Sequence, residues 1–182
     1  MRTIVLLFLI NCFFLQNACK NESKTLIINA KDLVFEKDEN EVVLAFLNGK
    51  LFSGQAISYF KSGKKFTKKS YNLGKEEGEW VIWHQNGNKM KNGRLEGGKK
   101  IGIFNEWYKS GQKKYEQPHQ AGQKHGKWYS WYENGVKWTE RDFENGQLNG
   151  KVLVWDSTGV LTNEYTYKNS QLIDKQHYFE SE

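Results

Sequence analysis

The sequence contains very little cysteine and proline. Both cysteines, Cys12 and Cys19, lie within the first twenty residues, and Pro118 is the single proline. The body of the protein therefore has no disulfide framework and no cysteine-based zinc site. One proline also excludes collagen-like and proline-rich architectures. The length of 182 residues corresponds to one domain or one repeat array.

Glycine and aromatic residues, by contrast, are abundant. The chain holds 17 Gly together with 7 Trp, 9 Tyr and 11 Phe. Glycine costs conformational order, whereas aromatic side chains require ordered packing. Extensive disorder is therefore excluded, and the positions of the glycines must explain how the two coexist.

The amino terminus has the features of an export signal. Arg2 precedes an apolar run from Ile4 to Leu15, which as a helix is about 18 Å long and too short for a hydrocarbon core of about 30 Å. Ala18 precedes Cys19, and a polar segment follows. This pattern resembles a bacterial lipoprotein signal, which implies a signal peptide over 1–18 and lipidation of Cys19, followed by a polar tether over 19–30. Ordinary secretion and an uncleaved anchor remain alternatives.

A regular repeat organises the rest of the chain, with a period of about 24 residues. Fourteen of the 17 glycines fall on one lattice with this step. They are Gly74, Gly98, Gly122 and Gly146; Gly54, Gly78, Gly102, Gly126 and Gly150; and Gly63, Gly87, Gly111, Gly135 and Gly159. About five copies of one structural unit are therefore expected.

Aromatic residues follow the same step in two main columns. One column holds Tyr59, Trp83, Trp107, Trp131 and Trp155, and the other holds Trp80, Phe104 and Trp128. The two columns are three residues apart, which in a regular strand places them on opposite faces of a sheet. Either both faces are partly covered, or a β-bulge realigns the columns.

The local sequence favours β-hairpins. Asn86-Gly87 and Asn134-Gly135 are signals for two-residue turns, and the Gly-x-x-x-Gly segments, such as 146–150, reverse the chain again. We predict an all-β fold: an elongated single-sheet antiparallel meander of about five 24-residue hairpin repeats, of order 50 Å long. The expected divisions are an N-terminal cap or half repeat over 31–53, the repeat array over 54–168 and a C-terminal cap or tail over 169–182.

The repeat itself resembles a known family. Segments such as Asn145-Gly146-Gln147-Leu148-Asn149-Gly150-Lys151 are similar to the variant MORN repeat found in YwqK-type antitoxins. The resemblance covers about residues 46–168. It implies a MORN-type hairpin array with an antitoxin-like or immunity-like partner role, but it implies little about mechanism.

Positive charge is concentrated in the array. Residues 46–168 hold 21 Lys and Arg against 12 Asp and Glu, whereas both flanks are acidic. The charge is interpreted as a solvated sheet face protected by lysine, with attraction to anionic lipid or surface polymer as the alternative. Nucleic acid is not an expected partner, because the leader directs the chain out of the cytoplasm.

The sequence offers no constellation typical of an enzyme. No nucleophile elbow, zinc-protease or phosphate-loop pattern occurs, and the four histidines lack paired ligand spacing. A repeat array places similar residues at the same position of every repeat and does not assemble a cluster of chemically different residues. We therefore expect no catalytic residue, no cofactor and no metal site.

We predict a non-catalytic lipoprotein of the bacterial cell envelope, on the outer membrane or facing the periplasm. Its array serves as a surface for an unknown envelope protein, and the alternative is a binding module for envelope polysaccharide or anionic phospholipid. The candidate binding residues are Trp83, Trp107, Trp131, Trp155, Lys89, Lys113 and Lys137. Aromatic columns of this kind pack structurally or stack on ligands.

Overall fold

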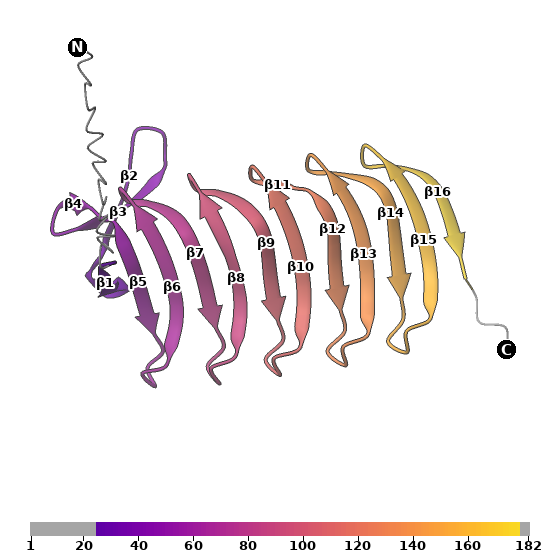
Figure 1. Cartoon of the computed structure of the whole chain (residues 1–182), viewed down its shortest axis with the longest axis horizontal. Coiled ribbons are helices and arrows are strands. Elements are labelled where there is room, and N and C mark those ends of the chain that lie inside the picture. Colours follow the sequence, from indigo (N-terminus) through magenta and orange to yellow (C-terminus); the bar gives the residue numbers. More distant parts are fainter. Residues whose placement is uncertain (1–24, 179–182) are drawn as a thin grey trace, which may run out of the picture.

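The computed structural model describes residues 25–178 and shows a chain built almost entirely of β-strands. The strands form a 13-stranded main sheet and a 3-stranded small sheet. In Figure 1 the strands of the main sheet lie side by side along the long axis, in chain order from β5 to β16. The predicted elongated meander of hairpin repeats is confirmed. The expected signal peptide and Cys19 lie outside the described residues.

The amino-terminal elements are short. They are β1 (Ile27–Asn29), a 3₁₀ turn η1 (Ala30–Asp32), β2 (Val34–Lys37), β3 (Val43–Leu47) and β4 (Lys50–Leu51). The repeat strands follow as β5 (Gly54–Tyr59), β6 (Lys65–Asn72), β7 (Lys75–Trp83), β8 (Lys89–Glu96), β9 (Lys99–Trp107), β10 (Lys113–Gln120), β11 (Gln123–Lys124), β12 (Gly126–Trp131), β13 (Lys137–Glu144), β14 (Gln147–Trp155), β15 (Leu161–Lys168) and β16 (Gln171–His177).

The start of the main sheet differs from the expected single antiparallel pattern. Strand β1 pairs with β5 in parallel, with Ile27 opposite Gln55. Residues 27–29, which the sequence assigned to a tether, are therefore part of the sheet. The small sheet of β2, β3 and β4 packs against the first repeat, where the buried cluster consists of Leu33, Ala45, Phe52, Ala56 and Tyr71.

The two kinds of turn are exchanged relative to the sequence prediction. Around Asn86-Gly87, five residues separate β7 from β8, and the amide of Gly87 donates to the carbonyl of His84 at 2.9 Å. Gly87 has a φ of 100°, whereas Asn86 keeps an ordinary negative φ. The arrangement is a turn followed by one left-handed residue, and glycine is favoured there because it adopts positive φ without steric cost.

The tight two-residue turns lie at the opposite end of the hairpins. Ala121 and Gly122 have φ values of 49° and 86°, and Asn145 and Gly146 have values of 49° and 85°. Two successive left-handed residues give the turn twist that suits antiparallel strands. The sequence prediction of two-residue turns at Asn86-Gly87 and Asn134-Gly135 was therefore wrong.

The two tryptophan columns lie on opposite faces of the main sheet. In β12, Trp131 contacts Tyr129 with ring centroids 5.8 Å apart, whereas Trp128 contacts Phe143 at 4.8 Å. The register between β12 and β13 shifts only where Trp131 pairs with Lys137, so β12 stays regular and its side chains alternate. We call the Trp131 side the ladder face and the Trp128 side the stack face.

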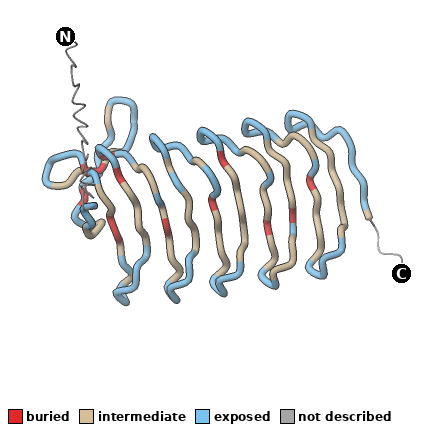
Figure 2. Tube along the Cα trace, in the orientation of Figure 1, coloured by how far each residue is buried: buried red, intermediate tan, exposed pale blue. Residues whose placement is uncertain are grey.

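Burial is sparse along the array. Figure 2 shows a few buried positions on strands that are mostly half-buried, with exposed turns at both ends of the hairpins. Within the array beyond the first repeat, the buried apolar side chains are Val81, Phe104 and Val152. Both faces of the sheet therefore remain accessible over most of their length.

Candidate functional site

The seven residues predicted for binding are brought together on the ladder face. The ammonium of Lys89 lies 6.0 Å from the ring centroid of Trp107. Lys113 lies 5.6 Å from Trp131, and the following repeat places Lys137 5.0 Å from Trp155. These are cation–π distances. The predicted residues thus form one continuous set, which we call the tryptophan–lysine ladder.

Strand pairing explains how the ladder arises from residues far apart in sequence. Each lysine begins the strand after a turn and pairs with the tryptophan that ends the preceding strand, as Lys137 does with Trp131. The next hairpin places its own tryptophan on the other side of that lysine. Indoles and ammonium groups therefore alternate along the sheet.

Side chains from neighbouring turns hold the backbone of the ladder tryptophans. The hydroxyl of Tyr108 donates to the Trp131 carbonyl at 2.9 Å, and the hydroxyl of Tyr132 donates to the Trp155 carbonyl at 3.0 Å. In the equivalent position of the second repeat, His84 Nε2 lies 3.1 Å from the carbonyl oxygen of Trp107. These bonds link each repeat to the next, so His84 has a positioning role in the sheet.

Carboxylates neutralise the ladder in its carboxyl-terminal half. Lys113 pairs with Glu116, and Lys137 pairs with Glu140 at 3.0 Å. Burial alone would raise the pKa of Glu140, but hydrogen bonds from Lys127 and Lys137 lower it below its usual value. This half of the ladder face therefore carries little unbalanced charge.

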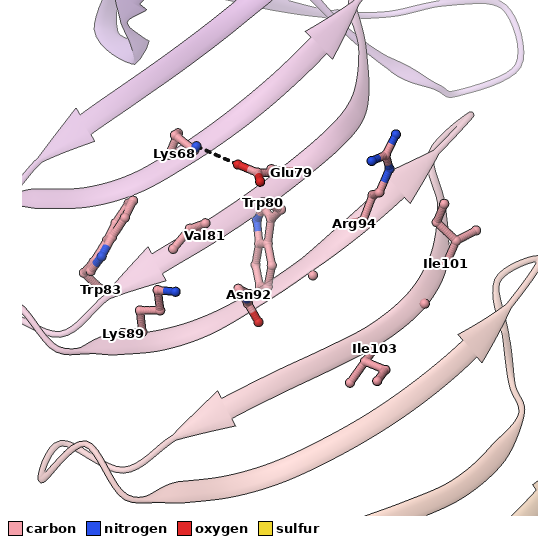
Figure 3. Close-up of a pocket in the computed structure, with 12 residues that line it drawn as sticks. Lys68, Glu79, Trp80, Val81, Trp83, Lys89, Asn92, Arg94, Ile101 and Ile103 are labelled. Atoms are coloured by element: carbon pink, nitrogen blue, oxygen red, sulfur yellow. Dashed lines mark hydrogen bonds and ion pairs between the residues drawn. The ribbon is translucent and has the colours of Figure 1, made fainter.

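The second and third repeats contain a shallow pocket on the same face. Its volume is about 550 Å³, and its charged lining residues are Lys68, Glu79, Lys89 and Arg94. Figure 3 shows Trp83 and Lys89 at one end and Arg94 with Ile101 at the other. Glu79 is bound by Lys68 at 2.7 Å, and this hydrogen bond lowers the pKa of the carboxyl group. Three cations and one carboxylate give the pocket an excess of positive charge.

The stack face carries a continuous row of rings. Trp80, Phe104, His119, Trp128 and Phe143 follow one another with centroid separations of 6.2, 5.1, 5.2 and 4.8 Å. Burial lowers the pKa of His119. The rings of this row shield one another from water, and Phe104 and His119 are both less than one-tenth exposed.

The off-lattice Gly93 makes room for this row. A Cβ atom there would lie 2.5 Å from two atoms of the Phe104 ring, although the backbone of Gly93 does not require glycine. Glycine at position 93 therefore leaves space for the Phe104 ring and is not needed for a turn. It differs in this respect from the lattice glycines, which have positive φ.

Residues 25–178 contain no group of three or more His, Cys, Asp or Glu side chains placed to hold a metal ion. Within the same residues, no helix has the length and apolar character needed to cross a bilayer.

The sequence prediction named the ladder but missed most of the pocket. Asn92, Arg94, Ile101 and Ile103 line the pocket and were not predicted. A signal for them exists in the repeat alignment: Asn92 stands where the two following repeats have Glu116 and Glu140. Departures from the repeat therefore coincide with the pocket.

Comparison with known families supports the repeat assignment. A family model described as MORN repeat variant matches residues 124–145 and 148–169. These two adjacent segments span the hairpins from β11 to β15. No curated protein matches the chain significantly. The chain thus contains MORN-type repeats, and repeats of this kind support a binding module built from an extended sheet.

Proposed function

We propose that the protein is a non-catalytic lipoprotein of the bacterial envelope whose ladder face binds another envelope protein. The observation that carries the proposal is the row of Trp83, Trp107, Trp131 and Trp155 on one accessible face, none of them buried. Tryptophan is the residue most enriched at the energetic centres of protein interfaces. An array that presents four tryptophans in a row offers an extended surface for a partner protein.

The antitoxin-like role implied by the family resemblance fits this proposal under one condition. An exported protein cannot neutralise a toxin in the cytoplasm. The partner must therefore be met at the membrane, in the periplasm or outside the cell, and inhibition by surface masking would require no chemistry from the array.

Photocrosslinking from the two faces tests the protein-binding proposal. A photoreactive residue replaces Tyr129 on the ladder face of the full chain in cells, and a matched one replaces Tyr165 on the other face. We expect a specific adduct from position 129 that Trp131→Ala abolishes, and no such adduct from position 165. Equal adducts from both positions, or insensitivity to Trp131→Ala, would contradict the proposal.

The anchor is tested separately by Cys19→Ala. We expect the variant to lose membrane association and lipoprotein processing, because two or three acyl chains supply stable anchoring. Retention in the membrane fraction with unchanged processing would refute the anchor. That result would leave the binding proposal intact, because it concerns only the leader.

A second candidate function is binding of envelope polysaccharide or anionic phospholipid. The regular alternation of indole and ammonium along the sheet favours it, because a linear polymer or a lipid surface presents similar groups at repeated intervals. Sedimentation with cell-wall polysaccharide, and with phosphatidylglycerol or phosphatidylcholine vesicles, distinguishes these ligands. Binding that is confined to anionic vesicles and lost at high salt would favour lipid.

A further inference from the structure

We propose that the pocket between Trp83, Lys89 and Arg94 is a binding site for a short acidic oligosaccharide. The inference goes beyond the protein-binding function, and for its ligand class it rests on the second candidate function, which it narrows to one sugar chemistry and one place. Three departures from the repeat converge on this pocket, and each leaves a group available for a ligand.

The first departure concerns Lys89. The equivalent lysines Lys113 and Lys137 pair with Glu116 and Glu140 three residues on, but the corresponding residue after Lys89 is Asn92. Among residues 25–178, Lys89 has no carboxylate within 4.0 Å. Its ammonium is therefore available to an anionic ligand.

The second departure concerns Arg94. In the β12–β13 pair the equivalent position is Asp142, which binds Lys127 at 3.0 Å across the strands. In the β7–β8 pair Glu79 lies opposite Arg94, but Glu79 forms its ion pair with Lys68 at 2.7 Å, and Arg94 and Lys89 lower the pKa of this carboxyl group only by attraction at longer range. No carboxylate of the described chain lies within 4.0 Å of the Arg94 guanidinium. A guanidinium is well suited to bidentate recognition of a carboxylate or phosphate.

The third departure concerns Trp83. Within residues 25–178 it is the one ladder tryptophan with no ammonium over its ring, since Trp107, Trp131 and Trp155 are each covered by a lysine. Its indole face is free to stack on the C–H face of a sugar ring. The pocket thus combines a stacking platform with two available cations.

The dimensions favour an elongated ligand. Lys89 and Arg94 are five residues apart on β8, which is about 16 Å along a strand. Two acidic groups on an extended ligand can contact both residues more easily than one acidic group can. Between them, Val81 and Asn92 line the pocket, and Ile103, half exposed, lies opposite. A segment of a few sugar units, with an acid group on successive units, matches this arrangement.

Calorimetric titration of the full chain in detergent with tetragalacturonate tests the site. We expect saturable binding that weakens with salt and is absent for the methyl-esterified, neutral tetramer. Arg94→Gln should lower the affinity at least tenfold. Asn92→Glu should do the same, because it restores the glutamate of the sister repeats and pairs it with Lys89 without disturbing the repeat pattern.

The matched control is Lys151→Gln, which removes an ammonium that pairs with Glu164 at 2.6 Å outside the pocket and should leave tetragalacturonate affinity within twofold. Circular dichroism verifies that each variant is folded. Failure of the wild-type chain to bind, or an affinity equal to that of the wild type in both Arg94→Gln and Asn92→Glu, would overturn the site. Equally tight binding of tetraglutamate would overturn the sugar assignment. Crosslinking from position 129 reports the protein-binding function independently, so failure of one proposal is distinguishable from failure of the other.

Discussion

The amino-terminal end of the main sheet and the array that follows it are stabilised in different ways. At the amino-terminal end the small sheet covers one face, and Phe52 and Ala45 are almost fully buried between the layers. Backbone bonds join the layers, because the amide of Ala45 donates to Gly74 and the amide of Gly74 donates to Phe52, both at 2.8 Å. This region is a conventional two-layer core.

Beyond it, no second layer of described residues covers the sheet. Order there comes from contacts between neighbouring repeats: rings that stack along one face, lysines over indoles on the other and hydrogen bonds between successive turns. Such stabilisation is local and repeats along the chain. The comparison shows how an array keeps two broad faces open for binding while one end is closed by a core.

The largest expected loss of stability comes from a substitution in the core that the small sheet covers. Phe52→Ala should lower the free energy of unfolding by about 3–5 kcal/mol, because the ring is fully buried against Tyr71 with centroids 5.7 Å apart. The matched variant Phe143→Ala in the open array should cost about 1–2 kcal/mol, since its ring is only partly removed from water. Urea denaturation of the full chain measures both. Equal losses would contradict the distinction between the two regions.

The next effect concerns packing on the stack face. Gly93→Ala should lower the free energy of unfolding by about 1–3 kcal/mol, because the new methyl group overlaps the Phe104 ring. In a Phe104→Val background, which mimics Val152 in the same column, the same substitution should cost less. A double-mutant cycle by denaturation measures this coupling. If the losses in the free energy of unfolding from the two substitutions were strictly additive, the Phe104 ring would not be what excludes a larger side chain at position 93.

A smaller effect tests the bonds between turns. Tyr132→Phe removes the hydrogen bond to the Trp155 carbonyl and should cost about 1 kcal/mol. Tyr129→Phe is the control, because within the described chain its hydroxyl has no hydrogen-bond partner. Hydrogen exchange should show faster opening around residues 155–160 in Tyr132→Phe alone. Unchanged exchange there would argue against ties between repeats.

The smallest expected effect is a dependence of stability on pH that arises from His119 on the stack face. His119 lies between Phe104 and Trp128, its Nδ1 is 2.8 Å from the Gln117 carbonyl, and Lys100 and Lys124 are nearby cations. Burial lowers the pKa of His119 in the folded state. As the pH falls below about 6.5, His119 therefore becomes protonated in the unfolded chain at a higher pH than in the folded chain.

His119 should therefore contribute stability that is fully present above about pH 6.5 and lost as the pH falls towards its folded-state pKa. His119→Phe, which copies Phe143 of the next repeat, should reduce this loss in thermal denaturation between pH 7 and 5. An identical pH profile in the variant would exclude His119 as a source of the dependence. The other histidines are the same in both proteins, so they do not contribute to the difference between the two profiles.

Several features of the fold could be predicted because they depend on local rules that recur in every repeat. Glycine spacing predicted the hairpins, whereas the sequence left open whether the two tryptophan columns lie on opposite faces or are realigned by a bulge, and the structure places them on opposite faces. The turn types were misassigned, because Asn86-Gly87 satisfies a two-residue turn signal while the actual loop needs only one left-handed residue. Leu73 and Ala121 adopt positive φ without any sequence signal for it.

The candidate site was only partly predictable. Lys89, Lys113 and Lys137 were selected from sequence, but the position of each lysine over the tryptophan of the next hairpin depends on which strands become neighbours. Arg94 and Asn92 were not predicted, because the pocket arises where the pattern of charges changes between repeats and not at positions that recur.

The sequence by itself determined the all-β class and the repeated hairpins of about 24 residues, because these follow from the chemistry of residues close in the chain. Only the tertiary structure decided what each face presents. The parallel strand β1, the covering small sheet, the alternation of indole and ammonium, and the unbalanced cations at Lys89 and Arg94 all depend on contacts between strands. Their physical reason is the register of pairing, which sets the partner available to each ring and each charge.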